Sequence, residues 1–170
     1  REMRPAISNA GAQMNEKAQL SIENKGLHDR ENDLQIGFTV EEMTTRVEGQ
    51  LRGMGLIKNF APIVYIIAHG SSSANNPHHG AHDCGACSGR PGSVNARVFA
   101  YMANHVKVRA LLHSKGIEIS AETQFVGGLH DTAADEIAYF DQGFLTAKNA
   151  ALHLKNKAAM SRVNSYLRAA

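Results

Sequence analysis

The chain has 170 residues, a length that suits one domain better than two. Hydrophobic residues make up 43% of it and charged residues 20%, so the chain can bury a core and is not disordered by composition. A net charge of +2, no tryptophan and 6% aromatic residues argue against a nucleic-acid partner. Its best apolar run, Ile63–Ala68, is far shorter than the roughly 20 residues that cross a bilayer, and no signal peptide is expected.

The first third of the chain predicts one weak and one strong helix. Residues 1–33 are polar, and within them we expect a helix over Met14–Asn24. Further on, Thr39 and Glu42 form the capping-box pattern that begins a helix. Apolar residues then recur at three- and four-residue intervals until glycines end the helix near residue 53, and they predict one apolar face made of Val40, Met43, Val47, Leu51 and Met54.

Two short apolar runs predict strands. Ile63–Ala68 is a continuous, mostly β-branched run without alternation, which predicts a strand buried on both faces of a parallel sheet. Thr123–Gly128 predicts a second strand, which we expect to end in a polar loop at Leu129–Thr132. Because a helical crossover joins the two strands, we expect them to be parallel neighbours, with His69 and His130 at the same carboxyl edge.

Helices are predicted between and after these strands. Ser93 is the expected cap of a helix over Val94–Asn104, and a helix over Val106–Lys115 should stop at Gly116. Phe144–Leu167 predicts a long basic helix, whose charges indicate a solvated face more often than a docking surface. The order indicates an α/β fold, a parallel sheet flanked by helices. We divide the chain into a polar segment (1–38), an α/β unit that carries the site (39–144) and a basic C-terminal helix (145–170).

A long glycine-rich loop, residues 69–92, follows the first predicted strand. In an open parallel sheet, ligands bind beyond the carboxyl ends of the strands, and His69 is the first residue there. Cys84 and Cys87 follow as a C-x-x-C pair. Imidazole and thiolate are good zinc ligands, and a catalytic zinc needs three protein ligands plus an open position. His69 and Cys84 therefore predict part of a metal centre.

Simpler interpretations of these residues remain open. His69 can be a hydrogen-bonded structural histidine, and Cys87 a small buried apolar residue. Cys84 and Cys87 can instead form a redox pair. His130 followed by an aspartate can orient a metal ligand or only satisfy loop backbone. Other candidates are weaker: His78, His79 and His82 can face solvent, and Ser71–Ser73 lacks the pattern of a serine nucleophile.

Two blocks of the loop resemble the DabA family, the large subunits of an inorganic-carbon accumulation system. They are the stretch HGSSSANNPH from His69 to His78 and the stretch DCGACSG from Asp83 to Gly89. Shorter similarities flank them at Glu48–Leu56, Asn95–Arg97, Leu129–Thr132 and Asp135–Glu136.

The resemblance implies a β-carbonic-anhydrase-like fold and a zinc ion bound by two cysteines, one aspartate and one histidine. The family's histidine matches His69, and its downstream cysteine matches Cys84. The other two ligands belong to an upstream Cys-x-Asp-x-Arg motif that this chain lacks, so we expect a fragment with half of the zinc site. Asp83, Cys87 and His130 are the residues we expect to support the ligands.

The resemblance also implies a function. In the family, zinc-dependent hydration of carbon dioxide to bicarbonate is coupled to a proton-conducting membrane subunit of the DabB type. This implies a peripheral protein at the cytoplasmic face of the membrane, whose partners are that subunit and the missing upstream half of the same polypeptide. We expect this chain alone to be inactive. The alternative is a non-catalytic fragment or a generic zinc- or thiol-binding module.

Overall fold

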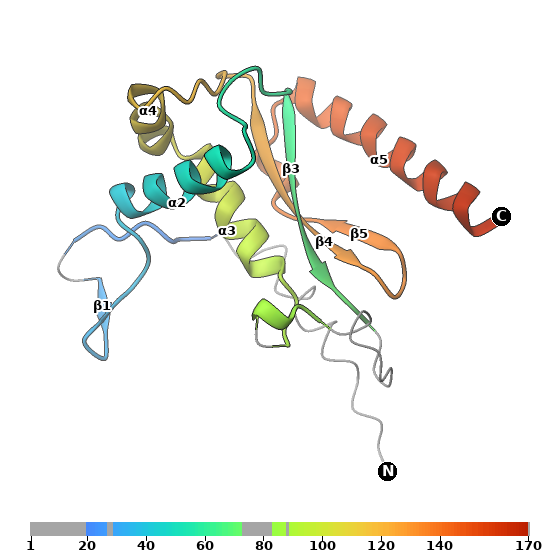
Figure 1. Cartoon of the computed structure of the whole chain (residues 1–170), viewed down its shortest axis with the longest axis horizontal. Helices are drawn as coiled ribbons and strands as arrows, with labels where there is room; N and C mark the ends of the chain where they lie inside the picture. Colours follow the sequence, from blue (N-terminus) through green and yellow to red (C-terminus); the bar gives the residue numbers. More distant parts are fainter. Residues whose placement is uncertain (1–19, 27–28, 73–82, 88, 170) are drawn as a thin grey trace, which may run out of the picture.

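The structure is a computed structural model that describes residues 20–26, 29–72, 83–87 and 89–169. A small mixed sheet lies at its centre, with the long helix α5 on one side and the helices α2, α3 and α4 on the other (Figure 1). The strands of this sheet are β3 (Ile63–Gly70), β4 (Gln124–Asp131) and β5 (Glu136–Tyr139). The helices are α2 (Val40–Gly53), α3 (Ser93–Asn104), α4 (Val106–Ser114) and α5 (Ala147–Ala169).

The parallel pair predicted from the sequence is confirmed. β3 and β4 are parallel neighbours, in a register that pairs His69 with His130. β4, however, continues to Asp131, so the loop expected at Leu129–Thr132 is wrong: these residues mostly form strand. β5 returns antiparallel through a tight connection in which Asp135 has a φ of 54°. The sheet is therefore mixed rather than parallel, because a hairpin follows β4 instead of another crossover.

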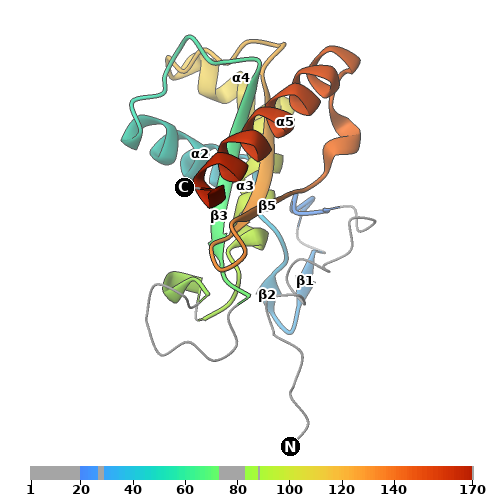
Figure 2. The ribbon, with the colours of Figure 1, turned by 90° about the vertical axis from the view of Figure 1, so that its right-hand side faces the viewer.

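β3 is less buried than its sequence predicts. Ile63 is 6% exposed, but Ile67 is 40% exposed, so the expectation of burial on both faces is wrong. Among the described strands β3 pairs only with β4 and is an edge strand. α5 crosses this face of the sheet and packs near Ile63 and Tyr65 (Figure 2), which leaves Ile67 partly uncovered.

Local signals predict α2 well. Thr39 Oγ1 accepts a hydrogen bond from Glu42 N (3.2 Å) and Thr39 N donates to Glu42 Oε2 (2.8 Å), which confirms the capping box. Three members of the expected apolar face are fully buried, namely Met43, Val47 and Leu51. Met54 does not belong to that face: it is 52% exposed because the helix has already ended at Gly53.

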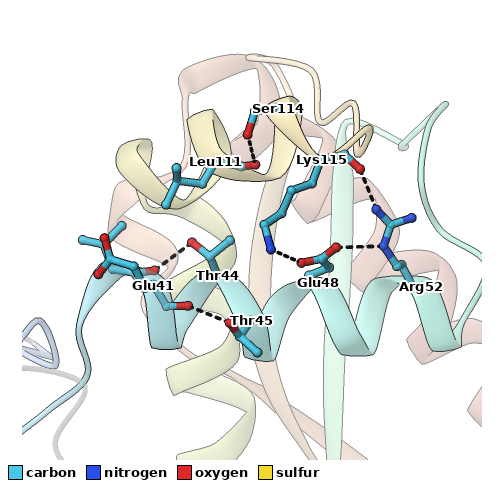
Figure 3. Close-up of polar contacts among 9 residues, drawn as sticks. Glu41, Thr44, Thr45, Glu48, Arg52, Leu111, Ser114 and Lys115 are labelled. Carbon is cyan, nitrogen blue, oxygen red and sulfur yellow. Dashed lines mark hydrogen bonds and ion pairs between the residues drawn. The ribbon is translucent and has the colours of Figure 1, made fainter.

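An ion-pair bridge links α2 to the end of α4 (Figure 3). Glu48 Oε1 accepts from Arg52 Nε (3.0 Å), and Glu48 Oε2 accepts from Lys115 Nζ (2.6 Å). Arg52 Nη2 also donates to the carbonyl oxygen of Lys115. The side chains of Arg52 and Lys115 are 45% exposed, so solvent screens the bridge and we expect it to add little to the stability.

The start of α3 differs from the sequence expectation. Ser93 is the first helical residue and Gly92 is the cap, so no side chain caps this helix. A Cβ on Gly92 would lie 2.8 Å from the Cβ of Ala68 in β3, which shows how closely the chain passes the sheet here. At the other end of the helical pair, α4 stops as predicted and Gly116 has a φ of 80°.

α5 begins later than predicted, because Gln142–Phe144 form a separate 3-10 turn before it. The helix docks on the sheet through polar groups. Asn149 Nδ2 donates to the carbonyl oxygens of Pro62 (3.2 Å) and Glu122 (2.9 Å), and His153 Nδ1 lies 2.9 Å from Tyr65 Oη. Among the helices described, none is long and apolar enough to cross a membrane.

The N-terminal region contains no helix where the structure describes it. The expected helix over Met14–Asn24 is wrong for residues 20–24, which are not helical, and its remainder lies outside the described residues. A two-stranded hairpin that the sequence did not predict follows, formed by β1 (Arg30–Glu31) and β2 (Leu34–Gln35). Asn24 holds it through a hydrogen bond from Nδ2 to Ile36 O (2.7 Å). The division of the chain into 1–38, 39–144 and 145–170 stays a prediction.

Candidate functional site

The carboxyl edge of β3 and β4 brings two of the candidate histidines together. His69 and His130 are partners in the ladder, and side chains of paired residues on neighbouring strands point to the same face. Ile63 and Tyr65, which share the parity of His69, pack on the α5 side of the sheet. The alternation therefore places both histidines on that side. His130 Nε2 lies 3.0 Å from Asp135 Oδ1, a partner that the sequence did not suggest.

Two aspartates hold the chain where it leaves β3. Asp83 Oδ1 accepts a hydrogen bond from Ser71 N (2.8 Å), and Asp131 Oδ1 accepts one from Ser72 N (3.0 Å). Asp131 also accepts from Ala133 N (3.0 Å) and Ala134 N (3.3 Å). Burial alone would raise the pKa of Asp131, but hydrogen bonds from the backbone and side chain of Ser72 and from the two alanine N–H groups outweigh it and lower the pKa. Asp83, predicted as a residue that supports the ligands, thus shapes the start of the loop.

The cysteine turn begins right after Asp83. Residues Gly85–Cys87 form a 3-10 turn in which Cys87 N donates to Cys84 O (3.0 Å). Beyond it, Asn95 in the first turn of α3 donates from Nδ2 to Cys87 Sγ (3.4 Å). The turn is therefore anchored at the N-terminal end of α3, the helix that covers the other face of the sheet from α5.

The two thiols of this turn differ chemically. The hydrogen bond from the Cys87 thiol lowers the pKa of Cys84. Burial and the charge of Asp83 oppose this effect, and the backbone N–H groups of Cys87 and Ala86 add to it, so the pKa is lowered. The same hydrogen bond raises the pKa of Cys87, together with its burial and the charge of Cys84. Cys84 is thus the sulfur that becomes thiolate first, as a metal ligand or a nucleophile must.

The described residues do not complete a metal centre. His69 lies on the α5 side of the sheet at its carboxyl edge, whereas Cys84 lies in the turn anchored at the N-terminal end of α3. Within residues 20–26, 29–72, 83–87 and 89–169, no three His, Cys, Asp or Glu side chains gather closely enough to hold a metal ion. The candidates His78, His79 and His82 lie outside these ranges. The zinc assignment of His69 and Cys84 stays a prediction.

An ion pair between α3 and the end of the hairpin was missed by sequence reasoning. Arg97, 4% exposed in α3, donates from Nε (2.8 Å) and Nη2 (2.7 Å) to the carboxylate of Asp141, which follows β5. α3 can lie this close to the sheet because Gly127 has no side chain: a Cβ there would lie 3.0 Å from backbone atoms of Ala96 and Arg97. The only available signal was Arg97 itself, as part of a short similarity block. Its partner lies 44 residues away.

Comparisons with known proteins cover the whole chain. The family model described as "Probable inorganic carbon transporter subunit DabA" matches residues 1–170. A protein of that name from Nitrosospira multiformis is 56% identical over 155 residues, which is 89% of this chain and 17% of the relative. One from Azotobacter vinelandii is 52% identical over 164 residues, which is 94% of this chain and 19% of the relative.

The comparisons identify the family but give no solved structure with which to compare the fold. The chain spans less than a fifth of the length of these two relatives. No solved structure matches it, so the similarity to β-carbonic anhydrases expected for the fold stays a prediction. The family model and both relatives carry the family name that the loop motifs suggested. The chain belongs to the family of probable inorganic carbon transporter subunits DabA.

Proposed function

We propose that this chain is part of a subunit that hydrates carbon dioxide to bicarbonate for inorganic-carbon uptake. The support for inorganic-carbon transport is membership of the DabA family and the names of its relatives. The same resemblance suggests a DabB-type membrane partner that conducts protons, and hence a peripheral position at the cytoplasmic face of the membrane. Both partner and position are part of the proposal.

Zinc is the cofactor we propose, with His69 and Cys84 as two of its ligands. The observation that carries this step is the sulfur of Cys84, because hydrogen bonds from a thiol and two backbone N–H groups favour its thiolate form. The remaining ligands would come from outside this chain. A bound zinc ion supplies a Lewis acid that makes water a competent nucleophile near neutral pH. The roles of Asp83 and His130 would be to fix the loop and the sheet edge around the ligands.

Matched cysteine variants test the ligand assignment. The matching segment of the Nitrosospira multiformis relative can be replaced by this chain, and the zinc content of the purified polypeptide then measured by mass spectrometry. We expect Cys84→Ser to remove most of the zinc and Cys87→Ser to retain most of it. The reverse pattern would refute the assignment. His69→Ala should act like Cys84→Ser.

The isolated chain provides a second test. We expect its stopped-flow hydration of carbon dioxide to equal the buffer rate, because two ligands leave a zinc ion under-coordinated. Hydration above that rate, abolished by a chelator, would show that the chain holds a complete site. The segment-swapped relative is the matched positive control.

A dithiol function is the second candidate, because the Cys87 thiol donates a hydrogen bond to Cys84. Cys84 thiolate would attack an external disulfide, and Cys87 would then displace the remaining thiol, so that the two cysteines lose two electrons and two protons while the external disulfide becomes two thiols. Reversible loss of both free thiols with oxidised dithiothreitol, in protein free of zinc, would favour this function.

A further inference from the structure

One edge of β3 is paired and the other is open. In a strand of a parallel sheet, the N–H and C=O groups of one residue both point toward the same neighbouring strand, and those of the next residue point to the opposite side. Gln124 N donates to Pro62 O (2.9 Å) and Thr132 N donates to Gly70 O (2.9 Å), so the even-numbered residues of β3 bond to β4. The backbone groups of the odd-numbered residues point away from β4, at Ile63, Tyr65, Ile67 and His69.

Most of these outward groups have no partner in the part of the chain that the structure describes. At His69 the edge is closed, because Gly92 N donates to His69 O (2.9 Å). The backbone groups of Ile63, Tyr65 and Ile67 that face outward make no hydrogen bond with described residues, and no described strand pairs with this edge. α5 covers a face of the sheet at Ile63 and Tyr65 and does not replace a neighbouring strand.

The sequence of β3 lacks the usual protection of an edge strand. Natural edge strands carry charged residues, proline or bulges, or are very short, because an open edge pairs with other chains. β3 has eight residues, reads IVYIIAHG, contains no charged residue other than a titratable histidine and no proline, and pairs with β4 without a bulge. Ile67, beside the open edge, is 40% exposed. The composition is that of an interior strand of a parallel sheet.

The length of the relatives indicates what covers this edge. The chain corresponds to 17% of the Nitrosospira multiformis relative and 19% of the Azotobacter vinelandii relative, so more than four fifths of such a polypeptide lies outside it. We propose that an extended segment from the rest of the longer polypeptide pairs with β3 at Ile63–Ile67, as a further, parallel strand of this sheet. This inference involves no metal, and it stands or falls separately from the zinc proposal.

Backbone hydrogen exchange tests the proposal directly. Residue-resolved exchange is measured on the 170-residue chain and on the Nitrosospira multiformis relative with the matching segment replaced by this chain. We expect the outward amides of Tyr65 and Ile67 to exchange more than about tenfold more slowly in the longer polypeptide. The inward amides of Val64 and Ile66, which bond to β4 in both proteins, are the internal control. Equal exchange of Tyr65 and Ile67 in the two proteins would overturn the proposal.

Two proline variants sharpen the result. Proline removes a backbone N–H, so Ile66→Pro breaks a bond to β4 and should lower the melting temperature of both proteins. Ile67→Pro removes an outward N–H. In the 170-residue chain, Ile67→Pro should lower the melting temperature far less than Ile66→Pro does. In the longer polypeptide, the two variants should lower the melting temperature by about the same amount. Equal effects of the two variants in the 170-residue chain would show that its outer edge is already paired, and would contradict the proposal.

Two other segments that would pair with the open edge of β3 give different results in the exchange experiment. If a second copy of the chain pairs with β3, protection of Tyr65 and Ile67 appears in the 170-residue chain and rises with its concentration. If another segment of the same 170 residues covers the edge, protection is present there at every concentration. Either result overturns the proposal, whereas protection confined to the longer polypeptide supports it.

Discussion

The two faces of the sheet are held by different chemistry. On the α3 side, Phe125 is fully buried between Phe60 and Phe99, and the close approach of the helix at Gly127 leaves an apolar, tightly packed layer. On the α5 side, the buried side chains of Asn149 and His153 dock the helix through hydrogen bonds. Apolar packing thus contributes most on the α3 side, whereas on the α5 side hydrogen bonds add to a smaller apolar cluster around Val126, so the two sides should respond to different substitutions.

The largest expected effect is on the apolar side. Phe125→Ala should lower the free energy of unfolding by about 3–5 kcal/mol, because it leaves a cavity among side chains that cannot collapse into it. Val126, the next residue of β4, points to the α5 side and is also fully buried. We expect a smaller loss for Val126→Ala, measured by urea unfolding of both variants. Because Val126→Ala removes fewer carbon atoms than Phe125→Ala, an equal loss at Val126 would show that the α5 side depends on apolar packing at least as much as the α3 side.

An intermediate effect is expected at Asn149 on the polar side. Its Nδ2 group donates to Pro62 O, Glu122 O and Gln124 Oε1. Asn149→Ala should cost about 1–3 kcal/mol, because it removes the hydrogen bonds of a buried amide and leaves Glu122 O without this donor, while Pro62 O keeps its bond from Gln124 N. Asn149→Asp should cost more, since a carboxylate cannot donate and would face carbonyl oxygens.

Lys148 provides the matched control for Asn149. It is the preceding residue of α5 and its side chain is 71% exposed in an ion pair with Glu122. Lys148→Ala should change the stability by no more than about 0.5 kcal/mol in the same urea experiment. A comparable loss for both variants would mean that α5 is held by its charge rather than by the amide of Asn149.

The smallest expected effect is a pH dependence of the stability, which should come from His153 on the α5 side. His153 is 2% exposed, and burial, followed by the charge of Lys157, lowers its pKa. His153 Nε2 donates to Gln142 Oε1 (3.0 Å), so in the neutral ring Nδ1 is the acceptor of the Tyr65 hydroxyl (2.9 Å), and protonation would remove that acceptor. The rings of Tyr65, Tyr139 and His153 form one cluster, in which the Tyr139 and His153 centroids lie 4.9 Å apart.

The sign of this dependence follows from the lowered pKa. Above the ordinary histidine pKa of about 6.5 the stabilisation from neutral His153 is fully present, and it is lost as the pH falls from there through the lower pKa of the folded state. Unfolding measured from pH 7.5 down to pH 5 should show this loss. His153→Gln, which cannot titrate, should flatten the curve over the same window. A wild-type curve without slope would show that His153 titrates alike in both states.

Local signals explain which elements were predicted correctly. The start of α2 depends on Thr39 and Glu42, three residues apart, and its buried face follows a short repeat, so no distant residue is needed. The parallel pairing of β3 and β4 followed from their apolar runs and the helices between them. β5 was missed because Glu136–Tyr139 has little apolar alternation and forms a strand only by pairing with β4.

The candidate site was predicted only in part. The sequence correctly placed His69 and His130 at one carboxyl edge, since that depends on strand direction alone. It did not predict that Asp131 binds Ser72 N or that His130 meets Asp135, because polar residues at a strand end look the same whether they face a loop backbone or a ligand. The ligand roles of His69 and Cys84 came from the family resemblance and are still to be tested.

The elements with a local cause were readable from the amino-acid order alone: the capped helix, the β-branched strand, the C-x-x-C turn and the family to which they belong. Other features depend on tertiary contacts: Arg97 pairs with Asp141 across 44 residues, α5 docks through Asn149 and His153, and β3 lies at an edge of the described sheet. The two groups differ in the range of the interactions that form them. Caps and periodic faces act over one or two turns, whereas a buried polar group must find its partner wherever the fold brings a complementary group.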